Sequence, residues 1–179
     1  MGAKHDSAVV PDITRVRKAV GAAHQFPVWR TIKLGTCKTP YEYHDALRKA
    51  YFKIGEWGDD ILSKIDCSRQ QFDVDLVVLS VKELAPAYAC YTGICARGVE
   101  LGMELCPAEV GPALRLSYKD QPRCEWLHIT MEAIRGCDSN YHIFTVAHDP
   151  IGPWLCAYDG LLGSVLNADD RFVFVRRKS

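Results

Sequence analysis

The sequence predicts an α+β fold: a twisted, mixed, largely antiparallel sheet with helices from the N-terminal half packed on one of its faces. Segments with the apolar spacing of helices concentrate in the first half of the chain, whereas alternating or β-branched segments fill the second half. No internal repeat is visible. Because helices and strands are segregated along the chain, an α+β fold is favoured over an alternating α/β fold.

The first half carries most of the helical signals. Residues 12–24 space their apolar side chains as an amphipathic helix does, and residues 28–34 alternate as a strand does. Residues 39–42 (TPYE) form a capping box with proline at the first helical position, so a helix begins there and its apolar face continues to Ile54. Residues 59–65 form a further helical stretch.

A buried strand and a third helix follow. Residues 73–81 contain the aliphatic run 76–79, which is typical of a strand covered on both faces, and we predict that it is the central strand. A helix is predicted over residues 92–101, with Gly102 ending it, and residues 103–106 return as a short extended segment.

After Pro107 the pattern becomes β-rich. Turn-forming Gly, Pro, Asn and Asp separate short alternating segments, which predicts antiparallel strands in a meander. These segments are residues 114–118, 125–131, 141–147, 154–158 and 172–175.

Length, composition and charge fit one folded domain. The 179 residues are 48% hydrophobic, and their 22 basic side chains balance 22 acidic ones. We expect a mobile leader over residues 1–11 and a single domain over residues 12–179. No net field draws the chain to nucleic acid or to an anionic membrane, and no apolar stretch has the length of a membrane span. We therefore expect neither nucleic acid nor a membrane as a partner.

The eight cysteines give evidence on whether the protein occupies an oxidising or a reducing compartment. An even count is compatible with a disulfide framework, but no apolar signal segment begins the chain and several cysteines lie in apolar runs. Reduced thiols in the cytoplasm are the better interpretation. No C-x-x-C pair and no standard nucleotide-binding or nucleophile motif occurs, so the sequence predicts no metal, no cofactor and no catalytic residue.

The most polar segment within apolar surroundings runs from Cys106 to Gln121. If residues 114–118 form a strand, Arg115 points away from the core leucines. It could then bind a carboxylate or phosphate, or pair with Glu109 to hold a loop, and we favour the structural pair because such pairs outnumber ligand sites. Tyr118 and Asp120 carry the same ambiguity.

Two histidines form a second candidate cluster. His128 shares a strand face with Trp126, and His142 could oppose it from the next strand. Such a pair would suit acid–base chemistry or half of a metal site. A hydrogen-bonded pair on the sheet surface is favoured, because no third ligand has a defined position.

Several runs of the sequence resemble a family of small uncharacterised bacterial proteins associated with mobile DNA, among them integron gene-cassette proteins. The runs are residues 29–35, 104–112, 114–116, 118–122 and 169–175, and the similarity extends over about residues 29–176. The resemblance implies no particular activity. It nominates the stretch that matches position by position, namely Glu109, Arg115, Tyr118, Asp120, Gln121, Glu125 and Trp126.

Departures from the family pattern weaken some candidate roles. Cys124, His128, Cys137 and residues 88–95 do not match the pattern. The resemblance therefore gives no support to a role for His128 or for these cysteines.

Three hypotheses about function follow. The first is a small-molecule-binding or protein-interaction module, expected as a homo-oligomer, with ligand contacts from Glu109, Arg115, Tyr118, Asp120 and Trp126. The second is an enzyme of unrecognised type, a hydrolase or transferase, that uses Glu109 or His128 as acid–base. The third, from the mobile-DNA association alone, is a toxin–antitoxin or phage-defence component.

Overall fold

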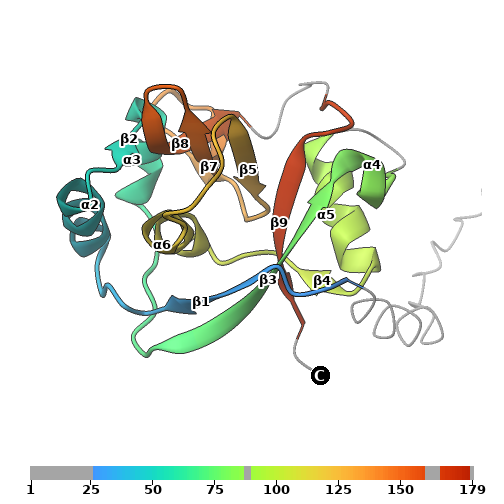
Figure 1. Ribbon diagram of the computed structural model, residues 1–179, viewed down its shortest axis with the longest axis horizontal. Coiled ribbons are helices and arrows are strands. Elements are labelled where there is room, and N and C mark those ends of the chain that lie inside the picture. The colour runs from blue at the N-terminus through green and yellow to red at the C-terminus, as the bar shows by residue number, and fades with distance from the viewer. Residues whose placement is uncertain (1–25, 87–89, 160–165, 178–179) are drawn as a thin grey trace, which may run out of the picture.

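The computed structural model describes residues 26–86, 90–159 and 166–177 (Figure 1). The expected leader over residues 1–11 and the expected helix over residues 12–24 lie outside these residues. The described part is an α+β fold with a mixed, largely antiparallel, curled sheet, so the predicted class is confirmed.

The main path of the sheet has the strand order β1-β3-β9-β5-β7-β8-β2. Strands β5 and β9 pair in parallel, as do β2 and β8, and the other pairs are antiparallel. Two short strands lie off the path, β4 beside β9 and β6 beside β7. The bounds are β1 Arg30–Leu34, β2 Lys53–Ile54, β3 Phe72–Ser80, β4 Met103–Glu104, β5 Glu125–Ile129, β6 Ile134–Arg135, β7 Tyr141–Asp149, β8 Gly152–Asp159 and β9 Arg171–Arg176.

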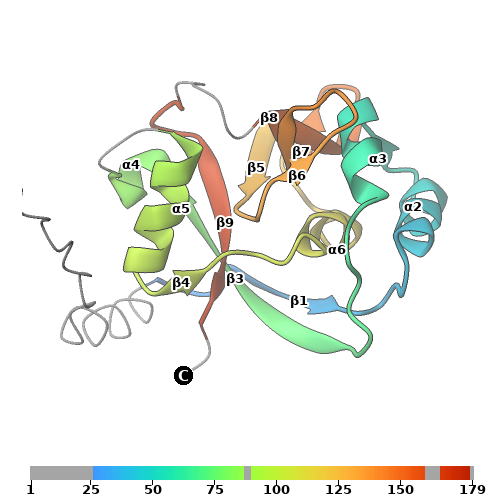
Figure 2. The same ribbon diagram turned by 180° about the vertical axis from the view of Figure 1, so that it is seen from behind.

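Helices occupy both sides of the curled sheet. Their bounds are α2 Pro40–Lys49, α3 Glu56–Leu62, α4 Val81–Leu84, α5 Tyr91–Glu100 and α6 Val110–Ser117. Helix α6 lies within the curl, in contact with β1, β7, β8 and α2, while α4 and α5 lie on the other side of β3 and β9 (Figures 1 and 2). The curl lets one short helix contact strands from both ends of the sheet.

Helix α2 begins where its sequence signal predicts. The Thr39 side chain accepts a hydrogen bond from the Glu42 N–H at 3.2 Å, and the Glu42 carboxylate accepts one from the Lys38 N–H at 2.7 Å, one residue before the expected donor. The helix ends at Lys49, earlier than its apolar pattern suggests. Tyr51 has a φ of 59°, and this left-handed residue turns the chain into β2.

The strand predicted over residues 114–118 is wrong, because these residues belong to α6 and its C-cap. The alternating segment is too short to distinguish the two-residue period of a strand from the 3.6-residue period of a helix. The spacing of Val110, Ala113 and Leu114, all buried, is that of a helix face. Gly111 allows α6 to approach the sheet closely, since a Cβ at this position would lie 2.6 Å from the Phe144 ring.

The aliphatic run of residues 76–79 lies in β3 as predicted, but β3 is not the central strand. It is second from the edge, and β5 takes the middle position. Leu76, Val77 and Leu79 are buried nonetheless. A continuous apolar run shows that both faces of a strand are covered, but it does not show where the strand lies in the sheet. The run therefore could not identify the central strand.

The contact between α5 and β9 gives a test of the packing. A Cβ at Gly98 would lie 2.1 Å from the Phe174 ring, which is itself fully buried. We expect Gly98→Ala to lower the free energy of unfolding by about 1–3 kcal/mol through overpacking, despite the better helix propensity of alanine. Urea unfolding measures this. Val99→Ala, on the exposed side of the same helix, should change it by about 0.5 kcal/mol or less; equal midpoints for Gly98→Ala and the unmodified chain would contradict the packing.

Candidate functional site

Glu109 sits at the N-cap of α6, and only 1% of it is exposed. Its Oε1 accepts hydrogen bonds from the Tyr43 hydroxyl at 2.7 Å and the Gly35 N–H at 2.8 Å. Its Oε2 accepts two more from Ser68, from the N–H at 2.9 Å and from the hydroxyl at 2.5 Å. Four donors from three separate segments therefore saturate the carboxylate.

Opposing effects act on the pKa of Glu109. Burial raises the pKa, but the hydrogen bonds from Ser68, Tyr43 and Gly35 outweigh burial and hold it below its usual range. The group is a carboxylate at neutral pH with no acceptor position left for a substrate. We assign Glu109 a structural role, which leaves the enzyme hypothesis without this acid–base group.

Arg115 is fully buried on the same helix and also binds only the protein. Its Nη1 donates to the Gln121 side chain and, at 3.2 Å, to the Ala147 carbonyl, and its Nη2 donates to the Tyr118 carbonyl. The guanidinium lies 4.7 Å from the centre of the Phe52 ring. Burial lowers the pKa of Arg115 to about 10, so it stays cationic at neutral pH.

The favoured ion pair between Arg115 and Glu109 is not formed. Each of the two charges takes other partners, at opposite ends of α6. The predicted ion pair assumed that residues 114–118 form a strand. Because they belong to α6 and its C-cap instead, the two side chains lie in different surroundings.

Tyr118 and Asp120 belong to a chain of polar contacts. Asp120 forms an ion pair with Arg30 at 3.1 Å, and the Arg30 guanidinium lies 4.5 Å from the centre of the Tyr118 ring. The Tyr118 hydroxyl donates to Glu125 Oε2 at 2.8 Å, while Glu125 Oε1 accepts from Arg171. Burial and the bond to Glu125 raise the pKa of Tyr118 to about 12. Tyr118 therefore keeps its proton at neutral pH, and its hydroxyl donates the hydrogen bond that orients Glu125.

The parallel pairing of β5 and β9 creates a hollow at the start of these two strands. Because the strands run in the same direction, their first residues, Glu125 and Arg171, lie close together, and so do the turns that precede them. The hollow has a volume of about 590 Å³, within the usual range for a small-molecule site. We call it the Glu125 hollow; it is lined by Arg123, Cys124, Glu125, Trp126, His128, Tyr158, Asp169, Asp170 and Arg171.

The hollow includes only part of the predicted site. Trp126 lines it, as does His128, and Tyr118 borders it through Glu125. Glu109 and Arg115 do not line it. Sequence reasoning did not nominate Arg123, Asp169, Asp170 or Arg171. The run of residues 169–171 (DDR) before a strand is the signal that could have found the last three.

The expected opposition of His128 and His142 is wrong. In the register of β5 and β7, His128 pairs with Thr145, while His142 pairs with Ile134 of β6. His142 Nε2 lies 3.1 Å from Asp138, and its ring stacks on Trp57. The two imidazoles thus lie in different surroundings, so neither the favoured hydrogen-bonded pair nor the alternative of joint acid–base or metal chemistry is formed.

His128 presents a neutral imidazole to the Glu125 hollow. Its Nδ1 is 2.9 Å from the Thr145 hydroxyl, and its ring packs against Tyr158 and Phe172. Burial lowers the pKa of His128 to about 4. Since Nδ1 is engaged, Nε2 is the ring nitrogen left for a ligand, as a neutral donor or acceptor rather than as a cation.

Across residues 26–86, 90–159 and 166–177, no three His, Cys, Asp or Glu side chains gather as a metal site requires. No helix in this part of the chain has both the length and the apolar character needed to cross a bilayer. Comparisons of the chain with family models, curated proteins and solved structures return no match.

A substitution at Glu109 tests whether its role is structural. We expect Glu109→Gln to lower the free energy of unfolding at pH 7 by about 2–4 kcal/mol, because an amide would turn its NH₂ toward two of the donors. The folded pKa lies below the ordinary value of about 4.3, so the carboxylate stabilises fully above that pH and loses its effect as the pH falls through the folded pKa. Denaturant unfolding between pH 7 and pH 3 should show the two proteins converging; a constant difference would contradict this.

His128 affects the free energy of unfolding in a different pH range. The unfolded histidine binds a proton near pH 6.5, whereas the folded one does so only near pH 4, so folding stability falls as the pH drops between these values. His128→Asn should remove on the order of 2 kcal/mol of the loss between pH 7 and pH 4.5. Chemical denaturation at both pH values measures it, and an unaltered pH dependence would overturn the buried, neutral assignment.

Proposed function

We propose that the chain is a small-molecule-binding module whose ligand is a zwitterion with an apolar or aromatic body, received in the Glu125 hollow. The observation that carries this proposal is the composition of the hollow lining. Two arginines, three carboxylates and two aromatic rings surround one space of about 590 Å³. A ligand with both charges would match both signs of the lining.

The arrangement gives each part of such a ligand a partner. Arg123 and the outer part of Arg171, which remains 41% exposed while it pairs with Glu125, suit a ligand carboxylate. Asp169 and Asp170 suit an ammonium group. Trp126, about half exposed, and Tyr158 offer ring faces to the apolar body.

Binding has more support than catalysis. The Glu109 carboxylate is saturated, and a histidine with a pKa of about 4 is a weak base at pH 7. His128 instead suits orientation of the ligand by a neutral hydrogen bond. We further propose, on the sequence resemblance and the reduced cysteines alone, a cytoplasmic protein encoded on mobile DNA. A homo-oligomer stays a prediction.

A thermal-shift screen tests the proposal. The screen uses amino acids, each beside the amine that lacks its carboxylate and the acid that lacks its amino group. We expect stabilisation that requires Trp126 only when both charges are present, by about 2.7 kcal/mol at 100 times the dissociation constant.

Matched variants locate the binding. Trp126→Ala should abolish the shift, whereas Tyr141→Ala, which removes a similarly exposed aromatic side chain outside the hollow, should leave it intact. Neither change should move the melting temperature of the free protein by much, because both side chains are about half exposed. Equal Trp126-dependent shifts from amine, acid and zwitterion, or a zwitterion shift that Trp126→Ala leaves unchanged, would reject the proposal.

A further inference from the structure

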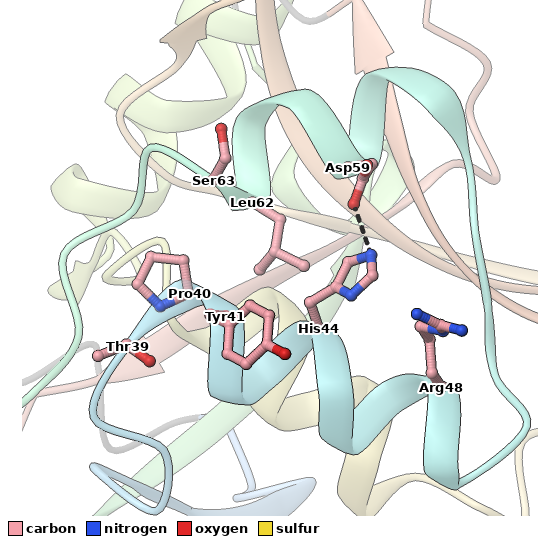
Figure 3. Close-up of a pocket in the computed structure, with 8 residues that line it drawn as sticks. All are labelled: Thr39, Pro40, Tyr41, His44, Arg48, Asp59, Leu62 and Ser63. Atoms are coloured by element: carbon pink, nitrogen blue, oxygen red, sulfur yellow. Dashed lines mark ion pairs between the residues drawn. The ribbon is translucent and has the colours of Figure 1, made fainter.

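A second hollow lies between α2 and α3, away from the Glu125 hollow (Figure 3). Its volume is about 500 Å³, again within the range of small-molecule sites. We call it the α2–α3 hollow; it is lined by Thr39, Pro40, Tyr41, His44, Arg48, Asp59, Leu62 and Ser63. No residue lines both hollows.

One end of the α2–α3 hollow carries its apolar side chains, beside the Thr39 and Ser63 hydroxyls, which bind the backbone. Pro40 and Tyr41, from the first turn of α2, lie near Leu62, from the last turn of α3 (Figure 3). Leu62 is buried, whereas the Tyr41 ring is largely exposed. A bound apolar group would cover ring surface that water now contacts, which favours binding.

The other end is charged. His44 Nε2 lies 3.1 Å from Asp59 Oδ1, so this pair links the two helices across the hollow (Figure 3). Arg48 follows His44 by four residues, which puts both side chains on one face of α2. Within the part of the chain that the structure describes, the Arg48 side chain makes no ion pair or hydrogen bond. Its guanidinium is available to a ligand.

We infer that the α2–α3 hollow binds a small organic carboxylate, with the carboxylate on Arg48 and the apolar body against Pro40, Tyr41 and Leu62. The planar guanidinium matches a carboxylate with two parallel hydrogen bonds. The length of the hollow along α2 separates the charged end from the apolar end, as an amphipathic ligand requires.

Asp59 decides between a carboxylate and a phosphate. Its carboxylate lies 3.1 Å from His44 Nε2 and lines the same hollow as Arg48, and more than half of its side chain is exposed. A doubly charged phosphate would meet stronger repulsion from it than a singly charged carboxylate. One arginine is also a small donor set for three phosphate oxygens.

A titration followed by two-dimensional ¹H–¹⁵N NMR tests this inference. The probes are 4-phenylbutyrate and its uncharged amide. We expect 4-phenylbutyrate to shift the backbone signals of α2 and α3 and to leave those of Arg123 to His128 unchanged. The amide should bind about tenfold more weakly, since loss of a charge-assisted hydrogen bond costs about 1.5 kcal/mol or more.

Two variants of equal charge separate a local contact from a general electrostatic effect. Arg48→Gln should weaken 4-phenylbutyrate about tenfold and leave the amide unaffected. Lys49→Gln removes the same charge from the next residue, which does not line the hollow and pairs with Asp45, and should preserve affinity. The NMR spectrum of each variant reports whether it is folded. Equal affinity for the two probes, equal effects of the two variants, or no shifts in α2 and α3 would overturn the inference.

Discussion

The buried carboxylate of Glu109 is the interaction on which the arrangement of this molecule depends. It joins the start of α6 to the turn after β1, to α2 and to the segment that leads into β3, through Gly35, Tyr43 and Ser68. A buried charge without donors would be costly, and here four hydrogen bonds in a region of low dielectric offset that cost. One side chain thus ties three segments of the chain to the start of α6.

Arg115 fixes the other end of the same helix. Its bonds to Gln121 and to the Tyr118 and Ala147 carbonyls hold the segment between α6 and β5 against β7. That segment carries the Tyr118 hydroxyl to Glu125. The negative charge at the start of α6 and the positive charge in its last turn also agree with the helix dipole.

Two kinds of charged group matter here: those that are enclosed and bind only the protein, and those that are partly exposed in the Glu125 hollow. Glu109 and Arg115 are enclosed, and their contacts are all with the protein itself. In the Glu125 hollow, by contrast, Arg171 is partly exposed and a ring nitrogen of His128 remains for a ligand. Binding requires the second kind of group, and the enclosed charges supply the fixed backbone that positions it.

The sequence by itself determined the fold class, the start of α2 and most of the strands, because element type follows from the local period and from caps within a few residues. It also nominated the segment of residues 109–126, but it could not assign roles within it. The donors to Glu109 lie 41 to 74 residues away in the chain, and the partner of His128 follows from strand register. Only the tertiary structure decided these partners, because a local sequence pattern does not specify which distant residues pair.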